Sequence, residues 1–506
     1  MNTNQKGNNT EISAGERIMK YIALFGGIQC ASLLVGLVIN KVASEFLGRI
    51  GVGLIATYNR TTRMLGDCTN LSLSFSAVRQ ISEIYNSGDE ELLSYWIKVL
   101  RSWTFITTVA GVLFTLVACL FISDWMFGGQ EYDIWYVLML AFTVGSMAVS
   151  GSELALLKAV QRLNDVAVCS FISISLGLLF SLPLYIFVGL SGILPAIFLV
   201  SVSQMIMYLC YTIPKYSYKI DIFSSKVLKD GLGMVKLGVG YIFAAILGSG
   251  SIWLVYELLR ELGGGDVVGL FSCGYFLMGV LPGVLFASID SDYYPRLSAI
   301  NRDTLLANKM VNEQIEIHLL LQTPLLLCFI VLIPLFLPLL YDVTFMDALP
   351  MIQIAMLAML VRTLNLPTGY ISLSKGDSRT FLLQEAIYDT LFVVFVVAGY
   401  QLFAIEGLGW AIVLAYLLEL FVILWLAANK YKFYIAKRNI KNFVIQGSIM
   451  VLAVVSAIYF KSGILYWVAG SLCILSSSLF SLMELRRRVT IMGRVRRILN
   501  KFISKR

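Results

Sequence analysis

Long apolar stretches alternate with short polar connections along all 506 residues of the chain. A helix needs about 20 mainly apolar residues to cross a bilayer, and fourteen stretches meet that requirement. The pattern predicts spans at 18–40, 50–78, 99–122, 134–157, 166–188, 190–212, 232–256, 267–289, 316–340, 348–372, 380–400, 405–428, 443–460 and 464–483. The connections are too short to hold a soluble domain, so the pattern predicts an all-α polytopic membrane protein with about 14 transmembrane helices.

The composition supports this prediction and excludes other classes of protein. Hydrophobic residues make up 58% of the chain and charged residues only 14%, with a mean hydropathy of +0.80. Soluble domains carry about 25% charged residues, so a soluble enzyme, a disordered scaffold and a nucleic-acid binder are excluded. The eight cysteines lie in or beside apolar runs without a C-x-x-C spacing. They are typical of buried thiols, and we expect neither a disulfide framework nor a metal site.

Basic residues predict how the chain is oriented. If the N-terminus is cytoplasmic, 32 of the 39 Lys and Arg fall in cytoplasmic segments and 4 in external ones. The other three, Arg60, Arg63 and Arg362, lie deep within spans, whereas basic residues in the first turns of a span are counted with the adjoining connection. This asymmetry follows the positive-inside rule and places both termini in the cytoplasm. Nine of the basic residues lie in the last 21 positions, where they are suited to anionic lipid at the cytoplasmic surface.

The two halves of the chain resemble each other at an offset of 215 to 218 residues. Gly53–Leu54 matches Gly269–Leu270, and Lys215–Tyr216 matches Lys430–Tyr431. Six spans per half is an even number, so the repeat is parallel, and such lobes are expected to face each other across a central cavity. The predicted parts are a cytoplasmic N-terminus (1–17), an N-terminal lobe (18–212), a linker (213–231), a C-terminal lobe (232–428), two further helices (443–483) and a basic cytoplasmic tail (484–506).

Three segments resemble a known family. They are the L-G-x-x-G-V-G-L turn (47–54), the A-V-R-Q-I-S-E end of the second span (77–83) and the L-S-K-G-D-S-R connection after the tenth span (373–379). With two six-helix lobes and two extra helices, the chain is similar to Wzx-type polysaccharide flippases of the multidrug/oligosaccharidyl-lipid/polysaccharide exporter superfamily.

The resemblance implies that the chain turns an undecaprenyl-diphosphate-linked oligosaccharide from the cytoplasmic to the outer face of a bacterial inner membrane, for O-antigen, capsular or exopolysaccharide assembly. It also implies contact with membrane lipids, and a polysaccharide polymerase and a chain-length regulator could be partners.

Charged groups in the second span are candidate substrate ligands, because a charge at mid-membrane costs about 2.5–3.5 kcal/mol on insertion scales. Asn59, Arg60, Arg63, Asp67 and Asn70 fall on one helical stripe. Arginine suits a diphosphate because its planar fork binds phosphate oxygens in pairs. The alternative is a structural Arg63–Asp67 ion pair between residues one turn apart. Asp67 could also occupy the arginines until the diphosphate replaces it.

The tenth to twelfth spans carry a second set of intramembrane charges. Arg362 is a candidate for a second phosphate or sugar contact, or for an ion pair with Glu385, Asp389 or Glu419. These carboxylates would allow coupling to a proton or sodium gradient, and Glu385 could instead reach the membrane interface. No other cofactor is expected.

Other functions fit parts of the same pattern. A lipid II flippase and a cation-coupled multidrug exporter of the same superfamily would share the two lobes. A membrane glycosyltransferase or polymerase is the alternative from another class, but it usually needs a sizeable external loop. The chain has no Walker motif, so ATP hydrolysis is not expected, and the pattern favours a transporter without catalytic residues.

The predicted topology can be tested by cysteine labelling from outside the cell. A cysteine at Lys461 should be labelled, whereas cysteines at Lys215 and Ile435 should be protected, because the first position lies in a predicted external connection and the others in cytoplasmic ones. Labelling at position 435 would rule out the fourteen-span topology.

Overall fold

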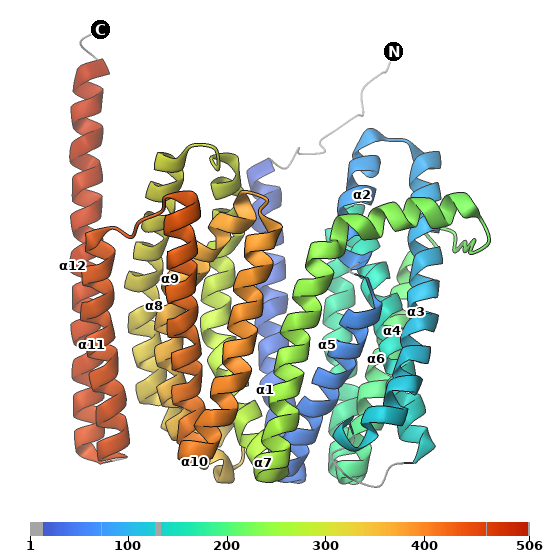
Figure 1. The fold of residues 1–506 in the computed structure, drawn as a ribbon, viewed down its shortest axis with the longest axis horizontal. Helices are drawn as coiled ribbons and strands as arrows, with labels where there is room; N and C mark the ends of the chain where they lie inside the picture. The colour runs from blue at the N-terminus through green and yellow to red at the C-terminus, as the bar shows by residue number, and fades with distance from the viewer. Residues whose placement is uncertain (1–13, 72, 127–132, 462, 504–506) are drawn as a thin grey trace, which may run out of the picture. The chain divides into compact units, whose positions relative to one another are not determined.

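A computed structural model describes residues 14–71, 73–126, 133–461 and 463–503, and all regular structure in these ranges is helical (Figure 1). Residues 1–13 of the predicted N-terminus, 127–132 of a predicted external connection and 504–506 of the tail lie outside the described residues. The helices are α1 (Ala14–Thr69), α2 (Leu73–Ser87), α3 (Glu90–Met126), α4 (Ile134–Ala159), α5 (Leu163–Phe187), η1 (Gly189–Gly192), α6 (Ile193–Thr212), α7 (Ser225–Ala299), α8 (Thr304–Leu340), η2 (Val343–Ala348), α9 (Leu349–Ser374), α10 (Ser378–Tyr431), α11 (Lys437–Phe460) and α12 (Ile464–Ile503).

The structure confirms the all-α membrane fold. In the described ranges, eleven helices are long and apolar enough to cross a membrane. Three of them contain a break with non-helical backbone angles, at Gly48 in α1, at Gly264 in α7 and at Phe403–Ala404 in α10. Each break falls between two predicted spans, so dividing these helices gives fourteen. Gly48 and Gly264 have φ values of 67° and 75°, a left-handed conformation that glycine adopts readily.

The prediction of an unbroken second span is wrong at its C-terminal part. Helix α1 ends at Thr69, and α2 begins at Leu73. Leu71 between them has a φ of 49°, which a residue with a Cβ seldom adopts in a helix. The polar stripe therefore continues as one helical face only as far as Asp67, and Asn70 lies beyond the helix end.

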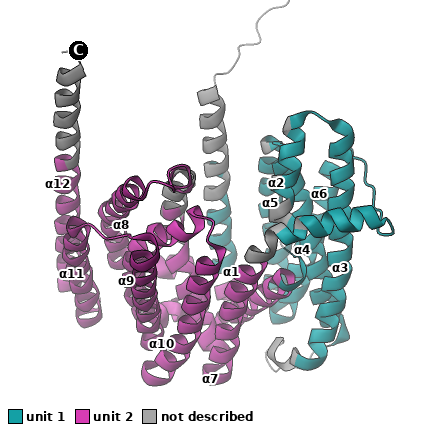
Figure 2. Ribbon diagram, turned by 45° about the horizontal axis from the view of Figure 1, so that its top comes forward, with its two compact units in different colours: residues 1–42, 68–121, 132–239 teal, residues 43–67, 122–131, 240–506 magenta. Residues whose placement is uncertain are grey.

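The chain divides into two compact units, which are coloured separately in Figure 2. Unit 1 comprises residues 1–42, 68–121 and 132–239, and unit 2 comprises residues 43–67, 122–131 and 240–506. In unit 1, α4 packs against α2, α5 and α6. Small residues bring α3 and α4 together, as Thr104 Oγ1 donates to Ser152 Oγ over 2.7 Å, and such contacts are typical of helix packing in membranes.

The predicted linker is held along one side of α3 in unit 1. Tyr95 donates its hydroxyl to Asp230 over 2.7 Å, and Ser102 accepts the backbone N–H of Asp221 over 2.9 Å. Lys98 lies 3.5 Å from the same Asp221. The chain that follows α6 is therefore fixed to unit 1 by polar contacts until α7 begins.

A buried ion pair provides the strongest of these attachments. The Arg101 guanidinium donates to both carboxylate oxygens of Glu153 over 2.8 and 3.0 Å. Its remaining nitrogen donates to the backbone carbonyls of Tyr216 and Ser217 over 2.9 and 3.0 Å. The two charged side chains are only 1% and 3% exposed. A buried pair is tolerated when hydrogen bonds satisfy its remaining polar atoms, and this arginine connects α3, α4 and the linker.

Unit 2 is built around α9, which packs against α8, α10 and α11. Met351, Ile354, Met356 and Met359 are among its fully buried side chains, which face several directions around the helix. Flexible methionine side chains fill irregular gaps between neighbouring helices. The helix is therefore enclosed by protein for most of its length.

Two glycines let the second half of α1 approach the second half of α7 in unit 2. A Cβ on Gly53 would lie 2.8 Å from the carbonyl oxygen of Gly265, and one on Gly269 would overlap the Arg49 carbonyl. The L-G-x-x-G-V-G-L segment is thus needed for close helix packing. Trp253 on α7 also donates to Thr61 on α1 over 3.1 Å.

The internal repeat is visible as the same contact in both units. In unit 1, Lys215 lies 2.6 Å from Asp165 at the start of α5. In unit 2, Lys430 pairs with Asp377 at the start of α10. Burial would raise the pKa of Asp377, but hydrogen bonds from Lys430, Tyr431 and Thr380 outweigh it and hold the pKa well below its usual value. An acid–lysine pair therefore joins the start of α5 to the end of α6 in unit 1, and the two ends of the broken helix α10 in unit 2.

We expect the Arg101–Glu153 pair to be essential for stability. Arg101→Ala should lower the free energy of unfolding by about 3–5 kcal/mol, because it leaves a buried carboxylate without a partner. Lys98→Ala removes a partly exposed pair and should cost less than about 1 kcal/mol. Thermal unfolding of the purified variants in detergent checks this difference, and equal losses for the two variants would contradict it.

Candidate substrate-binding site

Arg60 lies in the second half of α1, within unit 2, among aromatic rings. Its guanidinium carbon is 5.7 Å from the ring centre of Tyr256 and 5.8 Å from that of Tyr275. Among the described residues, no carboxylate lies within 4 Å of this guanidinium. Cation–π contacts stabilise a charge without neutralising it, so Arg60 retains its positive charge for an anion.

The aromatic rings continue from Arg60 across unit 2. Tyr275 packs near Phe392 with ring centres 6.0 Å apart, and Phe392 lies 5.8 Å from Tyr388. Tyr388 in turn meets Tyr416 edge to face at 5.2 Å. We call Tyr256, Tyr275, Phe392, Tyr388 and Tyr416 the aromatic cluster.

Arg362 on α9 lies at the other end of the aromatic cluster. Its guanidinium carbon is 5.1 Å from the ring centre of Phe286. Tyr416, Tyr388, Tyr275 and Glu419 also lie within electrostatic range of this guanidinium. Tyr275 interacts with both Arg60 and Arg362, so the structure brings these two predicted ligands to one cluster. Within the described residues, no carboxylate lies within 4 Å of the Arg362 guanidinium, but Glu419 and Glu385 are close enough to interact with its charge.

Two of the predicted acids, Asp389 and Glu419, accept hydrogen bonds from neutral side chains. Asp389 is buried and accepts a hydrogen bond from Ser251 over 2.9 Å. Glu419 accepts one from Asn365 over 2.6 Å, and the same amide donates to the Tyr416 carbonyl over 3.1 Å. Glu385 lies half-buried on α10, one turn before Asp389. Polar groups from α7, α9 and α10 thus line the same part of unit 2 as the aromatic cluster.

The other predicted residues of the second span are arranged differently from Arg60. Arg63 Nε lies 3.8 Å from Asp67 Oδ2 one turn along the helix, and the arginine side chain is 69% exposed. Asn59 is exposed and donates to the carbonyl of Ile55 in its own helix over 2.8 Å. Asn70 belongs to unit 1. Of these positions, only Arg60 joins the aromatic cluster.

The tyrosines were not identified from the sequence. Tyrosines occur often near the ends of spans, where they form an interfacial belt. The available signal was their depth, since Tyr388 and Tyr416 fall well inside predicted spans. In the part of the chain that the structure describes, His, Cys, Asp and Glu do not gather in groups of three or more that could hold a metal ion.

This geometry suits an anionic ligand with sugar groups. A guanidinium without a carboxylate can bind phosphate oxygens through several N–H groups. Tyrosine rings supply flat apolar faces, and their hydroxyls both donate and accept hydrogen bonds.

Residues 18–301 match a family described as "Polysaccharide biosynthesis protein". The match covers more than half of the chain. The protein belongs to this family. No curated protein matches its sequence.

Solved transporters share the fold of this polysaccharide biosynthesis protein. A lipid II flippase, MurJ, in an inward closed conformation is similar with a TM-score of 0.69 and 13% identity, over 92% of this chain and 99% of that one. An inward-facing multidrug resistance MATE transporter of the MOP superfamily is similar with a TM-score of 0.63 and 15% identity, over 82% of this chain and 96% of the other. At these identities the likeness establishes the fold, which is that of a multi-pass membrane transporter.

The arginine at the aromatic cluster should contribute less to stability than one paired with an acid. Arg260 Nη2 lies 2.6 Å from the fully buried Glu257 carboxylate. We expect Arg260→Ala to lower the free energy of unfolding by about 3–5 kcal/mol, and Arg60→Ala to cost about 0.5–2 kcal/mol. Thermal unfolding of both variants provides the comparison, and an Arg60→Ala protein as unstable as Arg260→Ala would assign Arg60 a structural role.

Proposed function

We propose that this protein is a flippase for an undecaprenyl-diphosphate-linked oligosaccharide. It carries the lipid from the cytoplasmic to the outer face of a bacterial inner membrane by alternating access, for O-antigen, capsular or exopolysaccharide assembly. The observation that carries the proposal is Arg60, a membrane-embedded arginine whose described neighbours are tyrosine rings and not carboxylates.

The diphosphate accounts for the charge of Arg60. Placing an unneutralised guanidinium in an apolar helix is costly, and the cost is offset in the transport cycle when an anion binds. Arginine stays protonated at any physiological pH and its fork matches two phosphate oxygens. The corresponding stretch of α7, 273–282, carries no charged residue, so the repeated fold does not itself require an arginine there.

The rest of the site offers contacts for the sugars. Arg362 and the tyrosines present donors, acceptors and ring faces from α7, α9 and α10. Such groups can bind an uncharged or acidic oligosaccharide through ring stacking and hydrogen bonds that do not depend on one particular sugar. We therefore assign the diphosphate to Arg60 and the sugars to the aromatic cluster with Arg362.

The acids beside the cluster are our candidates for ion coupling. Asp389 Oδ2 is buried without a hydrogen-bond partner, and Glu385 and Glu419 lie on the same helix, α10. Buried carboxylates that have no arginine within 4 Å can exchange a proton or bind sodium during a transport cycle. Their removal should change the dependence of transport on the ion gradient and leave the diphosphate contact intact.

A lipid II flippase is the second candidate. The observation that favours it is the likeness to MurJ over 92% of this chain and 99% of that protein. Both candidates would bring a lipid diphosphate to Arg60 and differ only in the sugars attached. Deletion of the gene separates them: loss of surface polysaccharide with normal peptidoglycan supports our proposal, whereas cell lysis from failed peptidoglycan export supports the alternative.

The role of Arg60 can be tested in a deletion strain complemented with variants. Arg60→Ala should abolish polysaccharide export. Protein abundance should stay near normal, because Arg60 contacts tyrosine rings and its removal leaves no carboxylate without a partner. Arg60→Lys should restore only part of the export, since an ammonium group lacks the bidentate geometry. The readouts are surface polysaccharide and the amount of protein in the membrane.

Arg302→Ala is the matched control, because Arg302 is exposed in the turn between α7 and α8. It should export normally. Normal export by Arg60→Ala would contradict the assignment of the diphosphate to this residue.

A further inference from the structure

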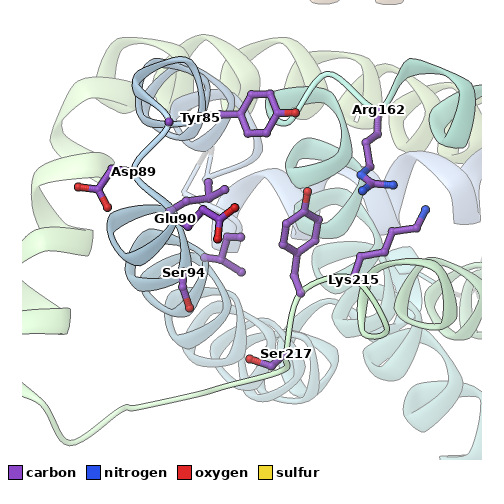
Figure 3. Close-up of a pocket in the computed structure, with 11 residues that line it drawn as sticks. Tyr85, Asp89, Glu90, Ser94, Arg162, Lys215 and Ser217 are labelled. Atoms are coloured by element: carbon purple, nitrogen blue, oxygen red, sulfur yellow. The ribbon is translucent and has the colours of Figure 1, made fainter. Parts of the chain in front are cut away.

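A polar cavity of about 610 Å³ lies in unit 1 and shares no residue with the aromatic cluster (Figure 3). It is enclosed by the α2–α3 turn, the start of α3, the α4–α5 turn and the chain that follows α6. Basic-residue counts predict that all three connections are cytoplasmic. The cavity is therefore expected at the membrane–cytoplasm interface.

Charges of opposite sign lie on opposite sides of this cavity. Arg162 and Lys215 are on one side, and Glu90 and Ser94 from α3 are on the other, whereas the Asp89 carboxylate points away (Figure 3). Arg162 and Lys215 share a single carboxylate, Asp165, at 3.4 and 2.6 Å, so their side keeps a net positive charge.

Two contacts fix the basic side of the cavity. A hydrogen bond with Tyr216 raises the pKa of Arg162 above its already high value, so the guanidinium stays charged. Arg101 donates hydrogen bonds to the backbone carbonyls of Tyr216 and Ser217, which line the cavity. The cavity wall is thus positioned before any ligand arrives, which lowers the entropic cost of binding.

The corresponding turns of unit 2 are tied together. Lys375 in the α9–α10 turn donates to the carbonyl of Asn301 over 2.6 Å. The Asn301 amide donates back to the carbonyl of Ser374 over 2.6 Å. In unit 2 these two turns therefore contact each other directly, whereas in unit 1 the cavity lies between their counterparts.

We propose that this cavity binds the headgroup of a phospholipid that carries both a phosphate and a primary amine. Arg162 and Lys215 would bind the phosphate, and Glu90 would accept hydrogen bonds from the ammonium group. The helices beside the basic side of the cavity carry exposed apolar side chains: Val168 and Phe171 on α5 are 45% and 58% exposed, and Ile213 after α6 is 42% exposed. These side chains would contact the acyl chains, which favours a lipid over a soluble phosphate.

The charge arrangement selects among lipid headgroups. A choline headgroup has the same phosphate but no N–H to donate to Glu90. A glycerol headgroup has no cation to pair with that acid. Phosphatidylethanolamine satisfies both sides of the cavity.

Native mass spectrometry of the full-length protein with added phosphatidylethanolamine or phosphatidylcholine tests this proposal. The wild-type protein should bind phosphatidylethanolamine about threefold more tightly, as expected for one partly exposed charge pair. Glu90→Gln should remove this preference while both lipids still bind. Glu91→Gln, the control at the adjacent exposed acid outside the cavity, should keep it.

The basic side has its own pair of variants. Lys215→Gln should weaken binding of both lipids, whereas Lys158→Gln, an exposed lysine near the α4–α5 turn that does not line the cavity, should not.

Equal binding of the two lipids by the wild-type protein, or equal effects of Glu90→Gln and Glu91→Gln, would overturn the proposal. Displacement of the lipid by millimolar glucose 1-phosphate would assign the cavity to a soluble phosphate instead. The measurement involves no transport, so its outcome is independent of the flippase proposal.

Discussion

A charged side chain within a membrane needs partners that replace water, and this requirement determines how the arginines of this protein are placed. Arg101 receives a carboxylate and two backbone carbonyls, and Arg260 receives the carboxylate of Glu257. Arg60 receives two tyrosine rings. The first two are neutralised by a carboxylate, and Arg101 also holds α3, α4 and the linker together. Arg60 is stabilised without being neutralised, which makes it the arginine suited to bind an anion.

The internal repeat separates what the fold needs from what function adds. Both units join helix ends with an acid–lysine pair, Asp165 with Lys215 and Asp377 with Lys430. These shared contacts are structural. Departures from the repeat are better indicators of function, because a contact absent from one unit is not required for folding. Arg60, which has no charged counterpart in 273–282, is a departure of this kind.

Hydropathy predicted most of the fold, because spans are defined by composition over about 20 residues. Even the breaks at Gly48 and Gly264 fall where two predicted spans meet. The break after Thr69 was missed, since Leu71 is apolar and the polar periodicity continues past it. Arg60 and Arg362 could be identified because a charge in an apolar run is conspicuous. Their tyrosine partners, and the pairing of Arg101 with Glu153 across 52 residues, depend on tertiary contacts that a single sequence does not reveal. The cytoplasmic termini, the lobe boundaries and the roles of Asp389, Glu385 and Glu419 stay predictions.

The central claim, that Arg60 binds the diphosphate of a lipid-linked sugar, is tested most directly by equilibrium binding to the purified protein. Undecaprenyl diphosphate and undecaprenyl monophosphate would be compared on the wild-type protein and on Arg60→Ala. Our account predicts that the wild type prefers the diphosphate and that Arg60→Ala weakens diphosphate binding by about tenfold or more, the order expected for charge-assisted hydrogen bonds, with a smaller effect on the monophosphate. Unchanged diphosphate affinity in a folded Arg60→Ala protein would contradict it.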